Sequence, residues 1–473
     1  MTPDEFRRHG HALVDWVADY LAHPERYPVL SRVEPGAITA ALPADAPDRG
    51  ESFEALFADF ERVLVPGLTH WNQPGFMAYF ASTASAPGIL AELLSAALNQ
   101  QAMLWRTSPA ATELESVTLG WLRRLLGLPD AFAGVIYDTA SISTLHALAC
   151  ARERAVPGVR VEGLVGRALP RMRVYASAQA HSSVDKAVML LGLGQTGLAH
   201  VPVDDAFCMR PDALREAIAR DRADGVQPLA VVATLGTTAT TSVDPVAAIA
   251  EICEAEGLWL HVDAAYAGAA AMLPDQRAHF AGWERADSVV VNPHKWLFTP
   301  FDLSAFYTRH PALLRAAFSL VPDYLRTADA EQSRNLMDTG IQLGRRFRAL
   351  KLWAVLRHFG AEGLRDRLAG HIALARMLAD WIEATPGWER VAPVPFSVVC
   401  FRATPADVPD DGLDAFNERL VEAVNATGEV FLSHTRLKGQ TVIRLAIGHE
   451  GTTAAHVTRA WALLQEQAVL LTA

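Results

Sequence analysis

Lysine is scarce in this chain of 473 residues. Only four of its 42 basic residues are lysines, namely Lys186, Lys295, Lys351 and Lys438. Arginine cannot replace lysine as an amine nucleophile, because its guanidinium stays protonated and does not form a Schiff base. If the protein uses a lysine for covalent chemistry, there are four candidates.

The chain also lacks an excess of positive charge and any long hydrophobic run. Its formal net charge is -11 and its sequence pI is about 5.8, which argues against nucleic-acid or anionic-membrane binding, since either needs a basic patch. No stretch of about eighteen apolar residues occurs, so no transmembrane helix is expected. The first residues predict a helix rather than a signal peptide, with Thr2 as N-cap, Pro3 in the first turn and Glu5 closing a capping box.

Cysteine is rare as well, and its spacing excludes two kinds of site. Cys150, Cys208, Cys253 and Cys400 form no CxxC pair and have no histidine at metal-ligand spacing. Neither a metal site nor a disulfide framework is therefore expected. Thiols of this kind are typical of the reduced core of a cytoplasmic protein.

What the sequence does have is ample apolar content, 51% of residues, arranged in alternating elements. Residues 1–85 are expected to be an N-terminal helical segment. Residues 86–370 alternate helical stretches with short apolar runs, which predicts a mostly parallel sheet covered on both faces. Residues 371–473 predict a small α+β domain. The runs expected to be strands are 172–176, 198–203, 229–235, 258–262, 289–291, 305–308, 396–401, 429–432 and 441–447.

One lysine stands apart from the other three. Lys295 follows the apolar run 288–291, which predicts a short buried strand, and α/β enzymes place their chemistry at the carboxyl ends of such strands. Lys186 lies on an apparent helix, Lys351 lies in an amphipathic run and Lys438 lies in a polar turn, so all three fit exposed positions. Lys295 is therefore the predicted functional lysine.

A carboxylate is expected close to this lysine. Asp263 ends the run 258–262 and precedes Lys295 by 32 residues, about one strand, helix, strand unit, so both side chains are expected at one edge of the sheet. A buried carboxylate needs a partner, and the protonated ring nitrogen of a pyridine cofactor would supply one. Taken alone, Asp263 could equally be a helix cap or part of an ion pair.

Three further groups follow predicted strands or precede helical stretches. The flat imidazole of His181 could lie against a planar cofactor ring. The hydroxyls and amides of residues 138–141 precede a helical run and could bind a phosphate, and residues 234–238 end another strand with threonines. Each pattern is weak alone, because Ser and Thr caps begin most helices.

Together these residues resemble a known family. The strings Asn-Pro-His-Lys-Trp at 292–296, His-Val-Asp-Ala-Ala-Tyr at 261–266, Ala-His-Ser-Ser at 180–183, Leu-Gly-Arg-Arg-Phe-Arg at 343–348 and Thr-His-Trp at 69–71 closely resemble those of the pyridoxal-phosphate-dependent group II decarboxylases. The aromatic-L-amino-acid decarboxylase branch is the best match. The resemblance implies an α/β fold of the aspartate-aminotransferase-like type (fold type I), pyridoxal 5'-phosphate as cofactor, and a homodimer with its active site at the interface.

The resemblance also implies roles for individual residues. Lys295 resembles the lysine that binds the cofactor, Asp263 the partner of the ring nitrogen, and His181 the residue stacked on the ring. Tyr324 is similar to the loop tyrosine that protonates the product carbon; relatives that form aldehydes tend to carry Phe there, or Asn in place of His181. The other implied positions are Ala140, Ser141, Asn292 and His294 around the phosphate, and Thr238 and Ala265 along the ring.

Two stretches depart from the family's pattern. Asp138 stands where family members often have glycine, and an acidic side chain would repel a phosphate unless it points away. Residues 339–344 read Thr-Gly-Ile-Gln-Leu-Gly, where relatives commonly have Trp-Gln-Ile-Pro-Leu-Gly. These departures bear more on the substrate than on the cofactor.

The expected reaction is decarboxylation of an aromatic L-amino acid of the tryptophan, hydroxytryptophan, tyrosine, phenylalanine or DOPA class. Gly344 matches a position that leaves room for a large ring, which favours an indolic substrate, whereas Arg106 could instead pair with an acidic one. A glutamate or aspartate decarboxylase, an aromatic aldehyde synthase and a non-catalytic homologue are the alternatives. The side chains that match the substrate pocket of relatives are Trp71, Tyr79, Phe80, Met103 and Trp105.

Overall fold

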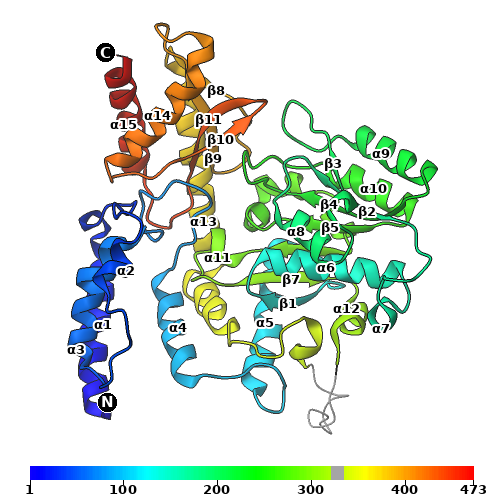
Figure 1. The fold of residues 1–473 in the computed structure, drawn as a ribbon, viewed down its shortest axis with the longest axis horizontal. Coiled ribbons are helices and arrows are strands. Elements are labelled where there is room, and N and C mark those ends of the chain that lie inside the picture. The colour runs from blue at the N-terminus through cyan, green and yellow to red at the C-terminus, as the bar shows by residue number, and fades with distance from the viewer. Residues whose placement is uncertain (321–334, 473) are drawn as a thin grey trace.

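A seven-stranded sheet lies at the centre of the larger domain in the computed structural model, which describes residues 1–320 and 335–472 (Figure 1). The strand order is β1-β7-β6-β5-β4-β2-β3, and neighbours are parallel except that β7 is antiparallel to both β1 and β6. This confirms the mostly parallel sheet. The strands are β1 (Ala133–Tyr137), β2 (Met172–Ser177), β3 (Leu198–Val201), β4 (Gln227–Thr234), β5 (Trp259–Asp263), β6 (Ser288–Val291) and β7 (Ser304–Thr308).

Strand β1 is missing from the predicted runs. It is short, and Gly134 weakens its β signal. The glycine is needed because a Cβ there would lie 2.9 Å from the ring of Tyr307 on β7. Close packing of the two strands therefore removes the side chain by which β1 would have been recognised.

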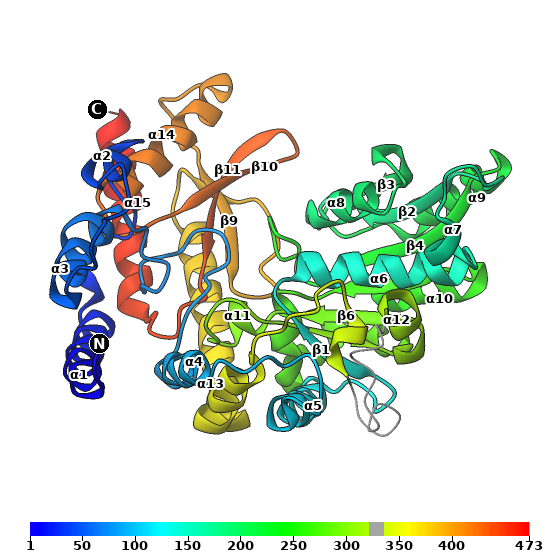
Figure 2. The same cartoon turned by 60° about the horizontal axis from the view of Figure 1, so that its bottom comes forward.

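Helices cover both faces of this sheet, as Figures 1 and 2 show. Side chains alternate along each strand, so that Tyr175 joins the core on one face while Val174 and Ala176 join the core on the other. One face is covered by α6 (Ala140–Ala155), α8 (Ser183–Leu190) and α12 (Pro311–Phe318), with α7 (Val159–Glu162) beside them. The other face is covered by α5 (Pro109–Leu126), α9 (Pro211–Ala223), α10 (Val246–Glu256) and α13 (Ala349–Ala384).

The second sheet is antiparallel, with the strand order β10-β11-β9-β8. Helix α13 leads into it and kinks at Gly360, where φ is 63°; the predicted boundary at 370/371 falls inside this helix. The predicted strand at 429–432 is wrong, because the ladder begins at Ser433, in a polar strand at the sheet's edge that lacks an apolar run. The remaining elements are β8 (Trp388–Arg390), β9 (Val398–Ala403), α14 (Leu413–Ala426), β10 (Ser433–Leu437), β11 (Gln440–Ala446) and α15 (Ala454–Thr472).

The N-terminal segment begins with the predicted capping box. The Thr2 hydroxyl accepts from the N–H of Glu5, and the Glu5 carboxylate accepts from the N–H of Thr2. No helix within residues 1–320 and 335–472 is both long and apolar enough to cross a membrane. The helices of this part of the chain are α1 (Pro3–Ala22), α2 (Ala37–Ala41) and α3 (Phe53–Asp59), followed by α4 (Ala86–Leu98).

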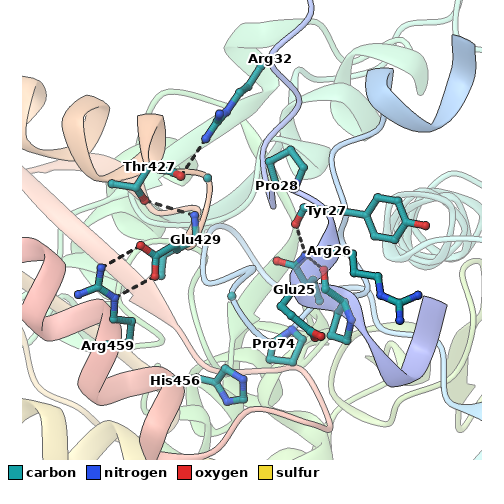
Figure 3. A pocket seen from close by; sticks show the side chains of 15 residues that line it. Glu25, Arg26, Tyr27, Pro28, Arg32, Pro74, Thr427, Glu429, His456 and Arg459 are labelled. Atoms are coloured by element: carbon teal, nitrogen blue, oxygen red, sulfur yellow. Dashed lines mark hydrogen bonds and ion pairs between the residues drawn. The ribbon is translucent and has the colours of Figure 1, made fainter. Parts of the chain in front are cut away.

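The connection between α1 and α4 is attached to the small domain. A cavity of about 400 Å³ lies at this junction, and Figure 3 shows side chains that line it, among them Arg32 and Thr427. Arg32 donates to the carbonyls of Ala426 and Thr427 at the end of α14. Further along the chain, the N–H of Ala446 in β11 donates to the carbonyl of Met77 at 2.8 Å. The N-terminal segment and the small sheet are therefore joined by main-chain hydrogen bonds.

The topology of the large sheet brings its polar loops to one edge. Strands β1 to β6 run in one direction, so their carboxyl ends open on the same side, and antiparallel β7 contributes its first residue, Ser304, there. Tyr137, the last residue of β1, pairs with Ser304, and Val291, the last residue of β6, pairs with Ala305. The loops that follow β1 and β6 therefore leave the sheet on either side of the start of β7.

Candidate functional site

Lys295 lies at this edge, in the short helix α11 (Pro293–Trp296) directly after β6. Its Nζ is 5.2 Å from the ring centroid of Phe80. Burial lowers the pKa of Lys295 below its ordinary value; the charge of Asp263 opposes this shift, and that of Arg444 adds to it. A lowered pKa leaves more of the amine neutral, which is the form that acts as a nucleophile.

Asp263 is the last residue of the neighbouring strand β5 and is 5% exposed. Its Oδ1 accepts from the N–H of Ala265 at 3.0 Å, and within the described residues the carboxylate makes no other hydrogen bond. In the sheet it lies beside Thr234 of β4, whose buried hydroxyl has no partner among those residues. A carboxylate held in this way can interact with a positively charged group on a ligand.

His181 follows β2 at the same edge and is exposed. Its Nδ1 accepts from the N–H of Ser183 at 3.1 Å and lies 2.9 Å from the Ser183 hydroxyl. Desolvation lowers the pKa of His181, which the charge of Asp263 opposes and that of Lys295 reinforces. Because Nδ1 is an acceptor, the neutral ring carries its proton on Nε2, and its face remains free to stack on a planar ligand.

The residues predicted around a phosphate come from the loops on either side of β7. Ala140 and Ser141 form the first turn of α6, whose N-terminus favours anions. The side-chain oxygen of Asn292 is buried with no partner in the described residues. His294 accepts from the N–H of Leu303 through Nδ1 at 2.8 Å, and burial lowers the pKa of His294 to about 3, so the ring is neutral.

The two departures from the family's pattern contact each other. The side-chain amide of Gln342 donates to Oδ2 of Asp138 at 3.1 Å, while Oδ1 of Asp138 accepts from the N–H of Thr139 at 2.5 Å. The acidic side chain is therefore hydrogen-bonded to the segment that contains the second departure. Its charge is engaged by local donors rather than left open.

Arg444 is a functional candidate that sequence reasoning missed. It lies on β11, is 3% exposed, and its guanidinium carbon is 4.7 Å from the centroid of the same Phe80 ring that Lys295 faces. Its Nε donates to the carbonyl of Thr238 at 3.0 Å, its Nη1 donates to the carbonyl of Tyr79, and its Nη2 is buried with no partner in the described chain. The signal that could have found it is a single arginine within the otherwise apolar run 442–446.

The predicted substrate residues fall into two groups. Trp71, Tyr79 and Phe80 precede α4, and Phe80 borders Lys295. Met103 and Gly344 belong to a second group, in which the carbonyl of Met103 accepts from the N–H of Met337, and a Cβ at Gly344 would lie 3.1 Å from the side-chain nitrogen of Gln101. Trp105 and Arg106 lie in the same stretch as Met103. Tyr324 lies outside the described residues.

The structure corrects the expectation for one lysine. Lys186 and Lys438 are exposed, but Lys351 is only 1% exposed and its Nζ lies 2.5 Å from Oε1 of Glu92. The amphipathic pattern around Lys351 was interpreted as a solvent-facing helix position. The pattern misled because the polar side of this stretch of α13 faces Glu92 of α4 rather than water.

Known proteins share both the sequence and the architecture. Over residues 35–404 the chain matches the pyridoxal-dependent decarboxylase conserved domain. It is 40% identical to the phenylacetaldehyde synthase of Arabidopsis thaliana, covering 100% of this chain and 97% of the relative, and 40% identical to tyrosine decarboxylase 2 of the same plant, covering 99% and 88%. The crystal structure of Oryza sativa TDC with PLP and tryptamine matches with a TM-score of 0.96 at 35% identity, covering 100% of this chain and 99% of that one.

Proposed function

Since the chain belongs to the pyridoxal-dependent decarboxylase family, we propose that it converts an aromatic L-amino acid, preferably an indolic one, to the amine and carbon dioxide. The protein is a carboxy-lyase and its cofactor is pyridoxal 5'-phosphate. The observation that carries the proposal is the placement of Lys295 and Asp263 after adjacent parallel strands at one edge of the sheet.

The residues present fit this cofactor. When bound, pyridoxal phosphate supplies an aldehyde that condenses with amines and a conjugated ring that accepts electrons as carbon dioxide leaves. Lys295 provides the amine that holds it, and Asp263 keeps a proton on the ring nitrogen. The first turn of α6 suits the phosphate end, to which the side-chain amide of Asn292 would donate through its nitrogen.

Two further side chains act on the substrate. The buried Nη2 of Arg444 has no partner within residues 1–320 and 335–472, and as a donor it suits the carboxylate of an amino acid. Tyr324, by resemblance, donates a proton to the α-carbon after carbon dioxide has left. A positioned general acid of this kind typically contributes about 10² to 10⁴ in rate.

An aromatic substrate is supported by the aromatic side chains that precede α4. Trp71 and Tyr79 are stacked with ring centroids 5.8 Å apart, and Phe80 borders the lysine. Aromatic rings that line a pocket favour a substrate with an aromatic side chain, because the rings can stack. Among similar proteins, one is named a tyrosine decarboxylase and another was crystallised with tryptamine. The small residue at Gly344 supports the indolic preference.

The deciding experiment is a product assay. The purified protein is incubated with pyridoxal phosphate and each of the twenty amino acids plus hydroxytryptophan and DOPA, and products are identified by mass. We expect tryptamine and other aromatic amines, with the highest kcat/KM for an indolic substrate. Formation of an amine only from glutamate or aspartate would overturn the aromatic assignment.

An aldehyde synthase remains the second candidate, because the chain is 40% identical to a phenylacetaldehyde synthase. We expect Tyr324→Phe to divert much of the product from amine to aldehyde, with release of ammonia and peroxide. Without the Tyr324 hydroxyl the α-carbon would be protonated more slowly, so that molecular oxygen could react there instead. Aldehyde and peroxide are measured beside amine in the wild type and the variant.

Two results would contradict this assignment. If Tyr324→Phe forms only amine at the wild-type rate, Tyr324 is not the proton donor. If the wild-type protein itself forms mainly aldehyde and peroxide, the protein is an aldehyde synthase.

The proposal includes a homodimer with the active site at the interface. Helix α1 has no buried residue, and it exposes two large apolar side chains, Phe6 and Val14. Helix α4 exposes Leu90, Leu94 and Leu98, which lie on one face at a spacing of four residues. Contiguous exposed apolar side chains of this kind are typical of an interaction surface. Because the family resemblance implies a homodimer, we assign this surface to contact with a second copy of the chain.

Leu94→Asp is expected to disrupt this dimer. A charge placed in an apolar interface costs more than it does in water, so the variant should sediment as a monomer at concentrations where the wild type is dimeric. Activity should fall in parallel, because the second group of substrate residues, with Met103 and Gly344, would come from the other copy. Val165→Asp is the matched control, since Val165 is 96% exposed and follows α7, which Figures 1 and 2 show well apart from α4. A dimeric Leu94→Asp protein would contradict the placement of the interface.

A further inference from the structure

Residues 339–345 lie against the carboxyl end of β1 and are hydrogen-bonded to it; we call them the β1-bound segment. At its start, the carbonyl of Thr339 accepts from the hydroxyl of Tyr137. At its end, Nη2 of Arg345 donates to the carbonyl of Ile136 at 2.6 Å. The side chains of Arg345 and Tyr137 are buried, so these bonds are shielded from water. The segment is therefore attached to the sheet at the edge where the candidate site lies.

The middle of the segment is bound by Asp138, the first residue after β1. The side-chain amide of Gln342 donates to Oδ2 of Asp138 at 3.1 Å. Oδ1 of Asp138 accepts from the N–H of Thr139 at 2.5 Å and from the Thr139 hydroxyl at 3.1 Å. The next residues, Ala140 and Ser141, begin α6 and are those assigned to the phosphate. One carboxylate thus joins the phosphate-binding turn to the β1-bound segment, and we call this link the Asp138–Gln342 bridge.

The β1-bound segment is also joined to the second group of predicted substrate residues. It contains Gly344, where a Cβ would lie 3.1 Å from the side-chain nitrogen of Gln101. The N–H of Arg345 donates to Oε1 of Gln101 at 2.6 Å, and the carbonyl of Arg345 accepts from the N–H of Ala102 at 2.9 Å. Met103 comes next in the chain. The segment and the stretch around Met103 therefore form one unit, which the bridge attaches to the phosphate-binding turn.

The central part of the segment has few other attachments. Residues 340–344 are neither helix nor strand, and two of them are glycines, whose backbone is the most flexible. The side chains of Ile341 and Leu343 are 59% and 48% exposed. The N–H of Ile341 is 3.4 Å from Nε2 of His146, which is a long hydrogen bond. Gln342 therefore provides the side-chain contact that fixes this part of the segment.

We propose that the Asp138–Gln342 bridge determines substrate specificity, by holding the β1-bound segment where the space at Gly344 admits an indole ring. Asp138 and Gln342 act through the segment, so both are positioning residues. The space at Gly344 favours a large ring only while the segment stays in place; a segment that moves accepts small and large rings alike. The inference rests on the proposed function, in which Met103 and Gly344 border the ring of the substrate.

The bridge can be broken and rebuilt with side chains of nearly unchanged size. Gln342→Glu removes the donor and places a second carboxylate against that of Asp138. Adding Asp138→Asn rebuilds the bridge in the opposite sense, because the new amide donates to the new carboxylate while its oxygen still accepts from the N–H of Thr139. Asp138→Asn alone also keeps a bridge, since the amide of Gln342 can rotate to offer its oxygen. Gln195→Glu is the control for an added charge, because Gln195 is exposed in the turn Gln195–Gly197 before β3.

The measured quantity is the ratio of kcat/KM for L-tryptophan to kcat/KM for L-phenylalanine, with saturating pyridoxal phosphate. We expect this ratio to fall about tenfold in Gln342→Glu, mainly through a higher KM for tryptophan, which is the size of effect that a lost hydrogen bond to a charged group produces. The ratio should return to within about threefold of wild type in the double variant, and stay within about threefold in Asp138→Asn and Gln195→Glu.

Amide hydrogen exchange of residues 339–345 in the apo-protein gives a readout that is independent of turnover. Exchange should be faster in Gln342→Glu and should slow again in the double variant. Unchanged exchange in Gln342→Glu would show that the bridge does not hold the segment, and faster exchange with an unchanged substrate ratio would show that the segment does not set specificity. Either result overturns the proposal, as does a double variant that remains as unselective as Gln342→Glu.

Folding and the proposed function are checked separately. Circular dichroism and thermal unfolding show whether each variant is folded; if Gln342→Glu is not, Gln342→Ala decides, and an unchanged substrate ratio in it overturns the proposal. A wild-type protein that forms an amine only from an acidic amino acid refutes the proposed function. A wild type that is active on aromatic amino acids, with the same ratio in every variant, refutes only the role of the bridge.

Discussion

Lys295→Ala is expected to lose turnover by roughly three orders of magnitude or more, because no other group can supply the amine that holds and exchanges the cofactor. Lys295 is the lysine that faces Phe80 at the edge of the large sheet, and burial favours its neutral, nucleophilic form by lowering its pKa. The variant should also lose the visible absorbance of the bound cofactor. Both are measured on purified protein with saturating pyridoxal phosphate.

Lys438→Ala is the matched control for this substitution. Lys438 is one of the four lysines, but its side chain is 55% exposed and pairs with Asp205 at the surface. Exposed pairs of this kind contribute little, so absorbance and turnover should remain near the wild-type values. A yellow and active Lys295→Ala protein would refute the assignment of the lysine.

Asp263→Asn is expected to lower kcat by roughly 10² to 10³, the typical effect of removing one preorganised electrostatic group. The substitution preserves size and can preserve the acceptor for the N–H of Ala265, which Oδ1 binds at 3.0 Å. It removes the negative charge that would keep a proton on the cofactor's ring nitrogen. Steady-state kinetics and cofactor content are measured together, so that a defect in chemistry is distinguished from a defect in binding.

Asp205→Asn serves as the comparison, because Asp205 is a fully exposed carboxylate whose partner is Lys438. It should leave kcat and cofactor content unchanged. If Asp263→Asn keeps wild-type kcat with full cofactor occupancy, the carboxylate does not act on the ring nitrogen, and its burial at 5% exposure needs another reason.

The sequence predicted those parts of the fold and site that depend on local pattern. The apolar run before Lys295 and the run that ends at Asp263 are β6 and β5, and their parallel pairing puts both residues at one edge. This succeeded because a strand buried on both faces is a continuous apolar run, so its end is easy to locate. The capping box at Thr2 was equally local.

Tertiary contacts explain what the sequence did not reveal. Arg444 reaches the site from the small domain, which is remote in sequence from Lys295, and only the folded chain sets its guanidinium 4.7 Å from the centroid of Phe80. Lys351 has the pattern of a surface helix residue, and its burial depends on Glu92 in another helix. Polar strand β10 has no apolar run to identify it. In each case the missing information is which distant element covers the residue.

The attachment of the N-terminal segment to the small sheet determines how firmly the aromatic side chains beside Lys295 are held. Met77 is hydrogen-bonded to β11, and Arg444 of the same strand donates to the carbonyl of Tyr79. Arg444 also donates to the carbonyl of Thr238 in the large domain, and the ring of Phe80 is stacked on that of Tyr266 with centroids 3.8 Å apart. The aromatic segment beside Lys295 is therefore fixed from both domains at once, so that a substitution of Arg444 would loosen this segment as well as remove a cation from the site.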